Sequence, residues 1–165
     1  MEIREMSLAD IDELSAFASK VFIDYYTKLI SYEQSAYMAG LFLSPQAIEK
    51  LMREGARFKA VYDNDQIVAF YEFKDEGEKI FLSKLYVAEK LRGKGIGRLM
   101  FNDLLQESHK TKASAIYLTV NKGNTPSFNI YTHLGFKVSD AVVNDIGQGY
   151  VMDDYIMEYD LKAGN

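Results

Sequence analysis

The sequence predicts a single α/β domain over residues 1–165, with a mixed, mostly antiparallel sheet of six to seven strands and helices on both faces. Two observations predict this fold class. A chain of 165 residues, 48% of them hydrophobic, is long enough for one domain with a sizeable core. Apolar residues recur at helical spacing before residue 55, alternate at strand spacing from Phe58, and later change period again.

A short strand and a capped helix are predicted at the start of the chain. Glu2–Met6 is the strand, and Ser7 with Asp10 has the spacing of a capping box. The helix that follows is expected to end near residues 25–28. Its apolar face consists of Leu8, Ile11, Leu14, Phe17, Ala18 and Val21.

Two more helices are predicted before the sheet. One covers Tyr32–Phe42. Ser44 and Pro45 then have the residue types of an N-cap and a first helical position, and Gly55 closes the helix that they start.

A meander of three antiparallel strands follows, with the sequences FKAVYD, QIVAFYEFKD and KIFLSKLYV. Turns at Asp63–Asp65 and near Glu76-Gly77 separate these strands. Five further elements complete the fold, with the closing pair of strands joined by a turn at Asp145–Gly149. The remaining elements are a helix over Gly97–Lys110, the strand AIYLTV, a helix over Pro126–His133 stopped by Gly135, and strands over Phe136–Ser139 and Tyr150–Leu161.

Charge and cysteine content exclude several function classes. The 19 Lys and Arg against 24 Asp and Glu give a net charge of −5, which argues against a general nucleic-acid binder. Because there is no cysteine, disulfides, a thiol nucleophile and thiolate zinc sites are excluded, and we expect no metal site. The sequence has neither a signal peptide nor an apolar run that could span a bilayer, so we expect a cytoplasmic protein without a membrane partner.

A glycine-rich turn between a strand and a helix, within Lys84–Arg98, has the most chemical content. Free backbone N–H groups at a helix N-terminus bind anions, and glycines let the backbone approach a phosphate. Arg92, Lys94 and Arg98 add mobile positive charge. The glycine spacing fits neither GxxxxGK[ST] nor GxGxxG, so it does not predict a P-loop or a Rossmann site. Taken alone, such a loop is also typical of an ordinary turn.

A second motif, N-x-x-S-x-x-I-Y-x-x-x-G-F, follows the next strand. Its residues are Asn124, Ser127, Ile130, Tyr131, Gly135 and Phe136. Together with R-x-x-G-x-G over Arg92–Gly97, it resembles the two acetyl-coenzyme A binding motifs of the GNAT superfamily of N-acetyltransferases. The predicted order of elements also resembles the fold of that family over nearly the whole chain.

The resemblance implies acetyl-CoA (coenzyme A) as the cofactor. The backbone of Leu85, Tyr86 and Val87 would pair with the pantetheine arm. The pyrophosphate would lie against Arg92, Gly93, Lys94, Gly95, Ile96, Gly97 and Arg98. Asn124 and Ser127 would contact the cofactor, and Tyr131 matches a tyrosine used near the thioester sulfur.

These residues also have structural readings. Asn124 could cap the helix at Pro126, and Tyr131 could be a packing residue at the edge of the core. Asn121 could also line the side of the cofactor that Asn124 contacts.

The family reaction is direct transfer of an acetyl group to an amine. An N–H near Val87 would stabilise the oxyanion, and Tyr131 would return a proton to the departing thiolate. An amine with an ordinary pKa near ~10.4 needs a base or a water relay before it can attack. The candidates are Glu72, Glu33, Asp153 and Asp154, while Lys84 occupies a position near which some relatives carry a carboxylate.

The acceptor is expected to be a small-molecule amine. Val138–Leu161 contains six acidic residues and no Lys or Arg, and its part GQGYVMDDYIMEYDL resembles the tail of the PaiA-type spermidine/spermine N-acetyltransferases. Lys84–Arg98, in contrast, holds five basic residues and one acid, which suits a polyanionic cofactor. A set of aromatic residues could bind an alkylammonium by cation–π contact. This set is Phe22, Tyr25, Tyr26, Tyr32, Tyr37 and Phe42.

Alternatives remain open at this point. The acids could be a solvated surface, and the aromatic residues could be packing or a homodimer surface. A non-catalytic acetyl-CoA sensor and an acetyltransferase acting on a peptide or lysine amine are the competing functions.

Overall fold

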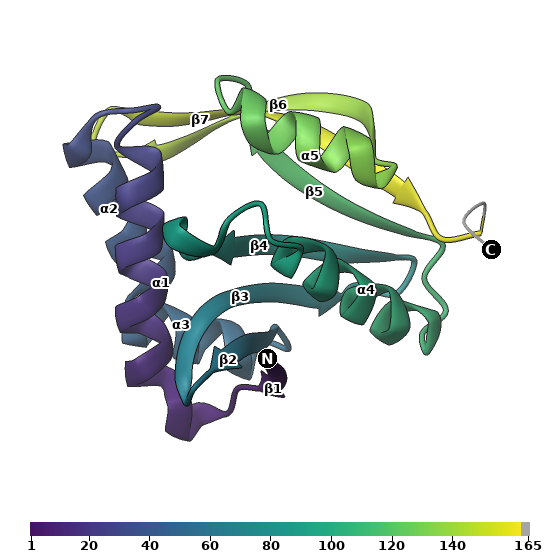
Figure 1. Ribbon diagram of the computed structural model, residues 1–165. Helices are drawn as coiled ribbons and strands as arrows, with labels where there is room; N and C mark the ends of the chain where they lie inside the picture. Colours follow the sequence, from purple (N-terminus) through teal and green to yellow (C-terminus); the bar gives the residue numbers. More distant parts are fainter. Residues whose placement is uncertain (163–165) are drawn as a thin grey trace. The chain divides into compact units, whose positions relative to one another are not determined.

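The structure is a computed structural model that describes residues 1–162 (Figure 1). Its strands are β1 (Glu2–Glu5), β2 (Arg57–Asp63), β3 (Gln66–Asp75), β4 (Lys79–Val87), β5 (Ala115–Asn121), β6 (Lys137–Gly147) and β7 (Tyr150–Asp160). Its helices are α1 (Ile11–Tyr26), α2 (Tyr32–Leu43), α3 (Pro45–Arg53), α4 (Ile96–His109) and α5 (Thr125–Leu134). Short 3-10 turns cover Leu8–Asp10 (η1) and Glu89–Leu91 (η2).

The strands form a seven-stranded sheet in the order β1-β2-β3-β4-β5-β7-β6. The pairs β1-β2, β2-β3, β5-β7 and β6-β7 are antiparallel, whereas β4 and β5 pair in parallel. The predicted α/β class with a mixed, mostly antiparallel sheet is therefore confirmed. No helix within residues 1–162 has the length and apolar character needed to cross a membrane.

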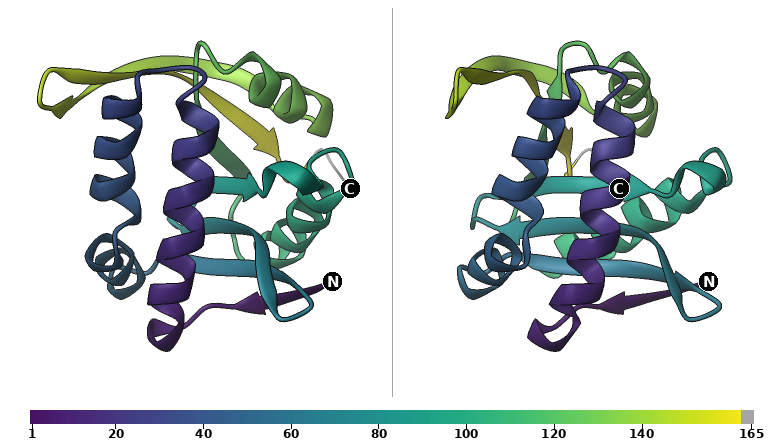
Figure 2. Two further views of the ribbon diagram at one scale, coloured as in Figure 1. Left: turned by 60° about the vertical axis from the view of Figure 1, so that its left-hand side comes forward. Right: turned by 90° about the vertical axis from the view of Figure 1, so that its left-hand side faces the viewer.

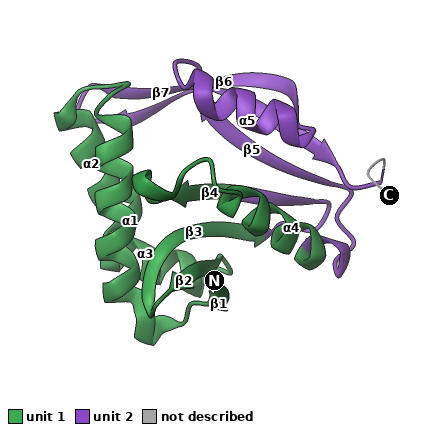
Figure 3. Cartoon of the chain, viewed as in Figure 1, with its two compact units in different colours: residues 1–74, 83–107 green, residues 75–82, 108–165 purple. Residues whose placement is uncertain are grey.

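Contacts divide the chain into two compact units (Figure 3). Unit 1 comprises residues 1–74 and 83–107, and unit 2 comprises residues 75–82 and those from 108 onward. Residues 163–165 of the expected domain lie outside the described part. Unit 1 holds β1 to β3 and the second part of β4, and unit 2 holds the start of β4 with β5 to β7.

In unit 1, helices cover both faces of the strands. The ring of Phe17 on α1 lies 6.2 Å from that of Phe70 on β3. Asp103 on α4 accepts hydrogen bonds from Tyr71 and, at 2.9 Å, from Lys59. Because Phe70 and Tyr71 are consecutive in a strand, their side chains point to opposite faces. Thus α1 and α4 lie on opposite faces, and α2 lies beside α1 in both views of Figure 2.

The start of α1 corrects one prediction. The capping box is present, since Ser7 N donates to Asp10 Oδ2 at 2.8 Å and Ala9 N donates to Ser7 Oγ at 3.3 Å. The segment it caps, however, is the 3-10 turn η1, and helical spacing begins only at Ile11. Leu8, predicted on the buried face, is therefore 47% exposed.

Unit 2 places α5 on one face of its strands. The ring centroid of Phe128 on α5 lies 5.5 Å from that of Tyr155 on β7. Gly135 ends the helix in the left-handed region at φ 111°, as predicted. Since side chains alternate along a strand, Asp154 and Ile156 face away from α5.

The last hairpin is longer than predicted. The sequence suggested a strand only over Phe136–Ser139, but β6 covers Lys137–Gly147 and pairs with β7 as far as Gly147 and Tyr150. β6 stands at the end of the strand order and most of its residues are exposed. A strand that is exposed on both faces has no alternation of apolar and polar residues, so the periodicity could not reveal it.

Candidate active site

The connection from β4 to α4 is built on glycines in unusual backbone conformations. Gly93 and Gly95 have φ angles of 77° and 86°, which side-chain-bearing residues rarely adopt. A Cβ at either position would meet nothing within 4 Å. Within unit 1, the glycines are therefore required by the backbone and not by crowding, and they leave open space beside the loop.

The first turn of α4 follows this loop directly. Leu99 N donates to Gly95 O at 3.0 Å, so the N–H groups of the residues between them precede the first helical bond. Such groups, with the helix dipole, favour an anion. Lys94 and Arg98 are exposed, and neither forms an ion pair within residues 1–162. This segment combines free positive charge with an open backbone, as the sequence predicts for a phosphate site.

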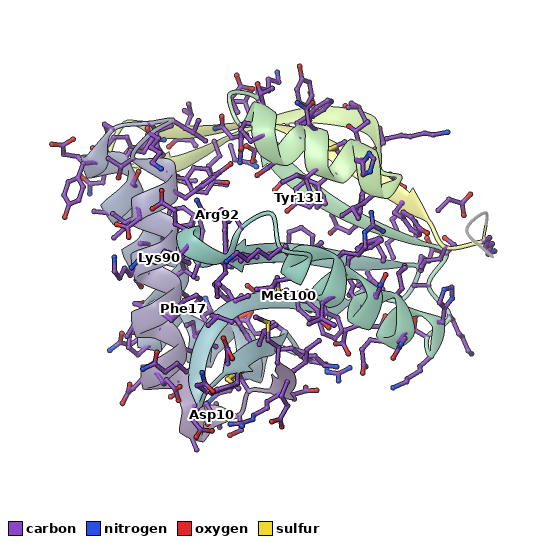
Figure 4. All side chains as sticks on the ribbon, viewed as in Figure 1. Asp10, Phe17, Lys90, Arg92, Met100 and Tyr131 are labelled. Atoms are coloured by element: carbon purple, nitrogen blue, oxygen red, sulfur yellow. The ribbon has the colours of Figure 1, made fainter. Side chains whose placement is uncertain are left out.

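Arg92 differs from its predicted role as a mobile charge (Figure 4). Its Nε donates to Val87 O at 3.1 Å, and its Cζ lies 5.0 Å from the ring centroid of Tyr25 on α1. Its backbone N–H also has an acceptor, Glu89 O at 3.3 Å. The Nε and the backbone N–H of Arg92 thus have acceptors inside unit 1, where they fix the end of β4 against η2, and the guanidinium lies beside the ring of Tyr25 on α1.

An aromatic cluster surrounds Tyr86 on β4. Its ring centroid lies 5.9 Å from Phe22, 6.3 Å from Tyr26 and 5.7 Å from Phe70. Tyr25 is joined to this cluster by its edge contact with Tyr26. Three of the six predicted aromatic residues, Phe22, Tyr25 and Tyr26, therefore take part in this packing.

The candidate bases in unit 1 have different surroundings. Glu72 on β3 accepts a hydrogen bond from Lys84 Nζ on β4 at 2.5 Å. The two side chains are 4% and 10% exposed, so this is a buried ion pair. A proton accepted by Glu72 would disrupt that pair and leave Lys84 as an uncompensated buried charge. Glu33 is an exposed residue in the first turn of α2.

In unit 2, both asparagines near α5 have structural partners. Asn124 is buried and its Oδ1 accepts from Ser127 N at 3.2 Å, which confirms the predicted cap of α5. Asn121 Oδ1 accepts from Gly123 N at 2.8 Å and fixes the turn after β5. Ser127 and Tyr131 are half-buried on α5, and the Tyr131 ring contacts Phe136 with centroids 5.7 Å apart.

Asp153 and Asp154 are consecutive on β7 but have opposite surroundings. Asp153 is exposed, and its Oδ1 lies 3.1 Å from Lys122 Nζ. Asp154 is only 3% exposed. Burial, with a smaller contribution from the Asp153 charge, raises the pKa of the Asp154 carboxyl to about 6. The sequence named both residues as candidate bases, and only the structure separates them.

Unit 2 also contains a hollow of about 470 Å³ that sequence reasoning missed. Four carboxylates line it, those of Glu76, Glu78, Asp140 and Glu158. Tyr117 donates to Glu76 at 2.5 Å across its wall, and Lys79 pairs with Glu158 at 3.1 Å. Two of these acids, Asp140 and Glu158, belong to the acidic segment Val138–Leu161. The other two come from the turn before β4, which carries no motif.

Comparisons with known proteins agree on one family. The model of the Acetyltransferase (GNAT) domain matches residues 26–152. The spermidine N(1)-acetyltransferase of Thermoplasma acidophilum is 26% identical over 153 residues, which cover 88% of this chain and 93% of that protein. The PaiA N-acetyltransferase from Thermoplasma acidophilum, crystallised with coenzyme A, has a TM-score of 0.80 at 22% identity, covering 97% of this chain and 99% of its own. The ribosomal-protein-S18-alanine N-acetyltransferase from Escherichia coli has a TM-score of 0.70 at 17% identity, covering 97% and 93%.

Proposed function

This chain belongs to the acetyltransferase (GNAT) family, and on that basis we propose that it transfers an acetyl group from acetyl-CoA directly to a primary amine, with a polyamine such as spermidine or spermine as the acceptor. The observation that carries the proposal is the open glycine loop leading into the N-terminus of α4. Acetyl-CoA, when bound, supplies the activated acetyl thioester. Every other role falls to side chains and backbone groups of the chain.

The phosphates are assigned to Gly93–Arg98. The left-handed glycines and the N–H groups of the first turn of α4 would bind the pyrophosphate, and Lys94 and Arg98 would add charge. Arg92 is left out of the direct contacts because its Nε donates to Val87 O and its backbone N–H donates to Glu89 O. It acts instead as a positioning residue for the end of β4.

The end of β4 would bind the pantetheine arm through the backbone of Leu85, Tyr86 and Val87. The Val87 N–H would donate to the acetyl oxygen as negative charge develops there. Arg92 holds the carbonyl of the same residue at 3.1 Å, which restricts the orientation of the adjoining peptide. A preorganised donor of this kind costs no reorganisation during the reaction.

In unit 2, the N-cap and two residues of α5 are given roles in the proposal. The Tyr131 hydroxyl would donate a proton to the sulfur as the carbon–sulfur bond breaks, and Asn124 and Ser127 would line the cofactor. No acyl-enzyme is expected, because the chain has no cysteine and no GxSxG sequence.

The polyamine is proposed from charge and from the relatives. Val138–Leu161 contains six acids and no Lys or Arg of its own, and an acidic surface attracts a polycation. Lysines from outside the stretch, Lys122 and Lys79, pair with two of the six, Asp153 and Glu158. One of the relatives named above is a spermidine N(1)-acetyltransferase.

The test of this acceptor is an assay of coenzyme A release with polyamines, amino acids, aminoglycosides and peptides. We expect the largest kcat/KM with spermidine or spermine. A higher kcat/KM with a peptide would contradict the proposal of a polyamine acceptor. Binding of acetyl-CoA without release of coenzyme A would favour the acetyl-CoA sensor.

A Gly97→Ala variant separates ligand binding from folding. A Cβ at Gly97 would lie 4.0 Å from Leu85 Cδ2, an ordinary contact, and the residue is helical. Alanine in a helix is more stable than glycine by about 0.5–1 kcal/mol. We therefore expect a higher free energy of unfolding but a Kd for acetyl-CoA that rises roughly tenfold, because the methyl group occupies the phosphate approach.

The matched control for this variant is Gly40→Ala in α2, where a Cβ would meet nothing within 4 Å. It should show a similar gain in stability with no change in Kd, as measured by denaturant unfolding and calorimetry. An unchanged Kd in Gly97→Ala would contradict the assignment of the loop.

An Arg92→Leu variant tests the positioning role. Because Arg92 holds Val87 and not a phosphate, we expect kcat to fall by roughly tenfold with acetyl-CoA and equally with acetyl-pantetheine, which lacks the pyrophosphate. A Lys94→Gln variant should lose kcat/KM with acetyl-CoA alone. A loss confined to acetyl-CoA in Arg92→Leu would show that the guanidinium binds phosphate after all.

A further inference from the structure

Asp154 is a buried carboxylate without a counter-charge. It is 3% exposed, and no residue within 1–162 forms a hydrogen bond or ion pair with its carboxylate. Buried polar groups in proteins nearly always have a partner, and a lone buried charge is costly. Such a residue therefore calls for an explanation beyond packing.

The neighbours of Asp154 do not supply the missing partner. Strand register places it between Asn121 on β5 and Val142 on β6, neither of which is charged. The nearest residue along the strand, Asp153, carries the same charge and faces the other side of the sheet.

A cation is available nearby but is used elsewhere. Lys122 Nζ lies 3.1 Å from Asp153 Oδ1 and 5.5 Å from the ring centroid of Tyr155. Asp153 and Tyr155 both lie on the face opposite Asp154, so the lysine serves that face alone. Lys122 thus balances the charge of Asp153 and leaves that of Asp154 unbalanced. A cationic ligand can balance the Asp154 charge.

We infer that the Asp154 carboxylate binds the ammonium group of the acceptor and takes its proton. This inference rests on the proposed function and names the base that the sequence left open. The ligand class is a primary alkylammonium, whose compact charge matches a single carboxylate.

Protons and electron pairs balance in the proposed step. One proton moves from the ammonium nitrogen to an Asp154 oxygen, and the freed lone pair forms the carbon–nitrogen bond. The carbon–sulfur bond breaks, and the sulfur takes the proton of the Tyr131 hydroxyl. The nitrogen loses its second proton to water, water returns a proton to Tyr131, and Asp154 releases its proton to water.

The burial that leaves Asp154 unpaired also suits it to this task. Burial, and then the Asp153 charge, raise its pKa to about 6. Because this value is still below neutral pH, the ionised form predominates there. A base whose pKa lies near the working pH is the most effective.

The test compares Asp154→Asn with the matched variant Asp153→Asn, using two acceptors. Spermidine is protonated at neutral pH, whereas methoxyamine is neutral and needs no initial deprotonation. For Asp154→Asn we expect kcat/KM to fall roughly 100-fold with spermidine and less than about tenfold with methoxyamine. Asp153→Asn should change neither by more than about threefold, and the Kd for acetyl-CoA should be the same in all three proteins.

Folding is checked by the thermal midpoint. Asparagine is isosteric and removes an unbalanced buried charge, so Asp154→Asn should melt at the same or a higher temperature than the parent. Equal losses with the two acceptors, or no loss with spermidine, would overturn the inference. A parent protein that acetylates no amine would instead overturn the proposed function, which the coenzyme A release assay reports independently.

Discussion

A Tyr131→Phe variant is expected to lose kcat by about 100- to 10,000-fold, because a positioned general acid contributes about that much to a reaction. Phenylalanine keeps the ring that contacts Phe136 with centroids 5.7 Å apart, and only the hydroxyl is removed. The Kd for acetyl-CoA should therefore change little. The loss should appear in the step that breaks the carbon–sulfur bond.

The measurement is single-turnover coenzyme A release with spermidine, together with calorimetric binding of acetyl-CoA. Tyr155→Phe is the control, since Tyr155 is also a half-buried tyrosine of unit 2 that packs on α5, with its ring 5.5 Å from Phe128. It should stay within about twofold of the parent. An unchanged kcat for Tyr131→Phe across the pH range would remove Tyr131 from the proposed mechanism.

Lys59→Met is expected to lower the free energy of unfolding by ~3 kcal/mol, because it breaks a buried ion network. Lys59 Nζ lies 2.9 Å from Asp103 Oδ2 and 3.0 Å from Glu107 Oε1, and its side chain is 10% exposed. Without it, Asp103 and Glu107, whose side chains are 22% and 14% exposed, lose a shared cation, and only Glu107 keeps a second one, Arg57. Denaturant unfolding measures the loss. Lys50→Met, which breaks an exposed pair with Glu54 at 3.9 Å, should cost less than about 1 kcal/mol.

The same ion network makes the free energy of unfolding depend on pH in the acidic range. Burial opposes ionisation of Glu107, but hydrogen bonds from Lys59 and Arg57 outweigh it and lower the pKa of Glu107 from 4.5 to about 2. A carboxyl with a depressed pKa stabilises the fold above its unfolded value, and this contribution is lost as the pH falls through the folded value. Stability should decline between these two pH values, and less steeply in Lys59→Met. Parallel acid titrations of the two proteins would contradict the role of this network.

The helix starts and the glycine loop were predictable because local chemistry determines them. Ser44 with Pro45, and Asn124, cap the helices that the sequence indicates, and the capping box of Ser7 with Asp10 is present but caps η1. The exposed β6 could not be found by periodicity, since neither of its faces is consistently apolar.

The candidate site was predictable as a set of residues but not in all its roles. Glycine spacing identifies the loop, yet the sequence could not reveal that Arg92 Nε donates to Val87 O, or that the guanidinium lies beside the ring of Tyr25, 67 positions away. Strand alternation predicts that Asp153 and Asp154 face opposite ways. Which of the two is buried depends on packing, and packing also decides which one Lys122 pairs with.

The most direct test of the central claim is an internal competition. The protein is incubated with acetyl-CoA and an equimolar mixture of spermidine, spermine, free lysine and a peptide with an alanine N-terminus. The acetylated products are then quantified by mass spectrometry, and their amount is compared with the amount of coenzyme A released. We predict one acetylated amine per coenzyme A, with acetylated polyamine dominating by at least about tenfold, a preference of ~1.4 kcal/mol in kcat/KM. Dominance of the acetylated peptide, or coenzyme A release without an acetylated amine, would contradict the account.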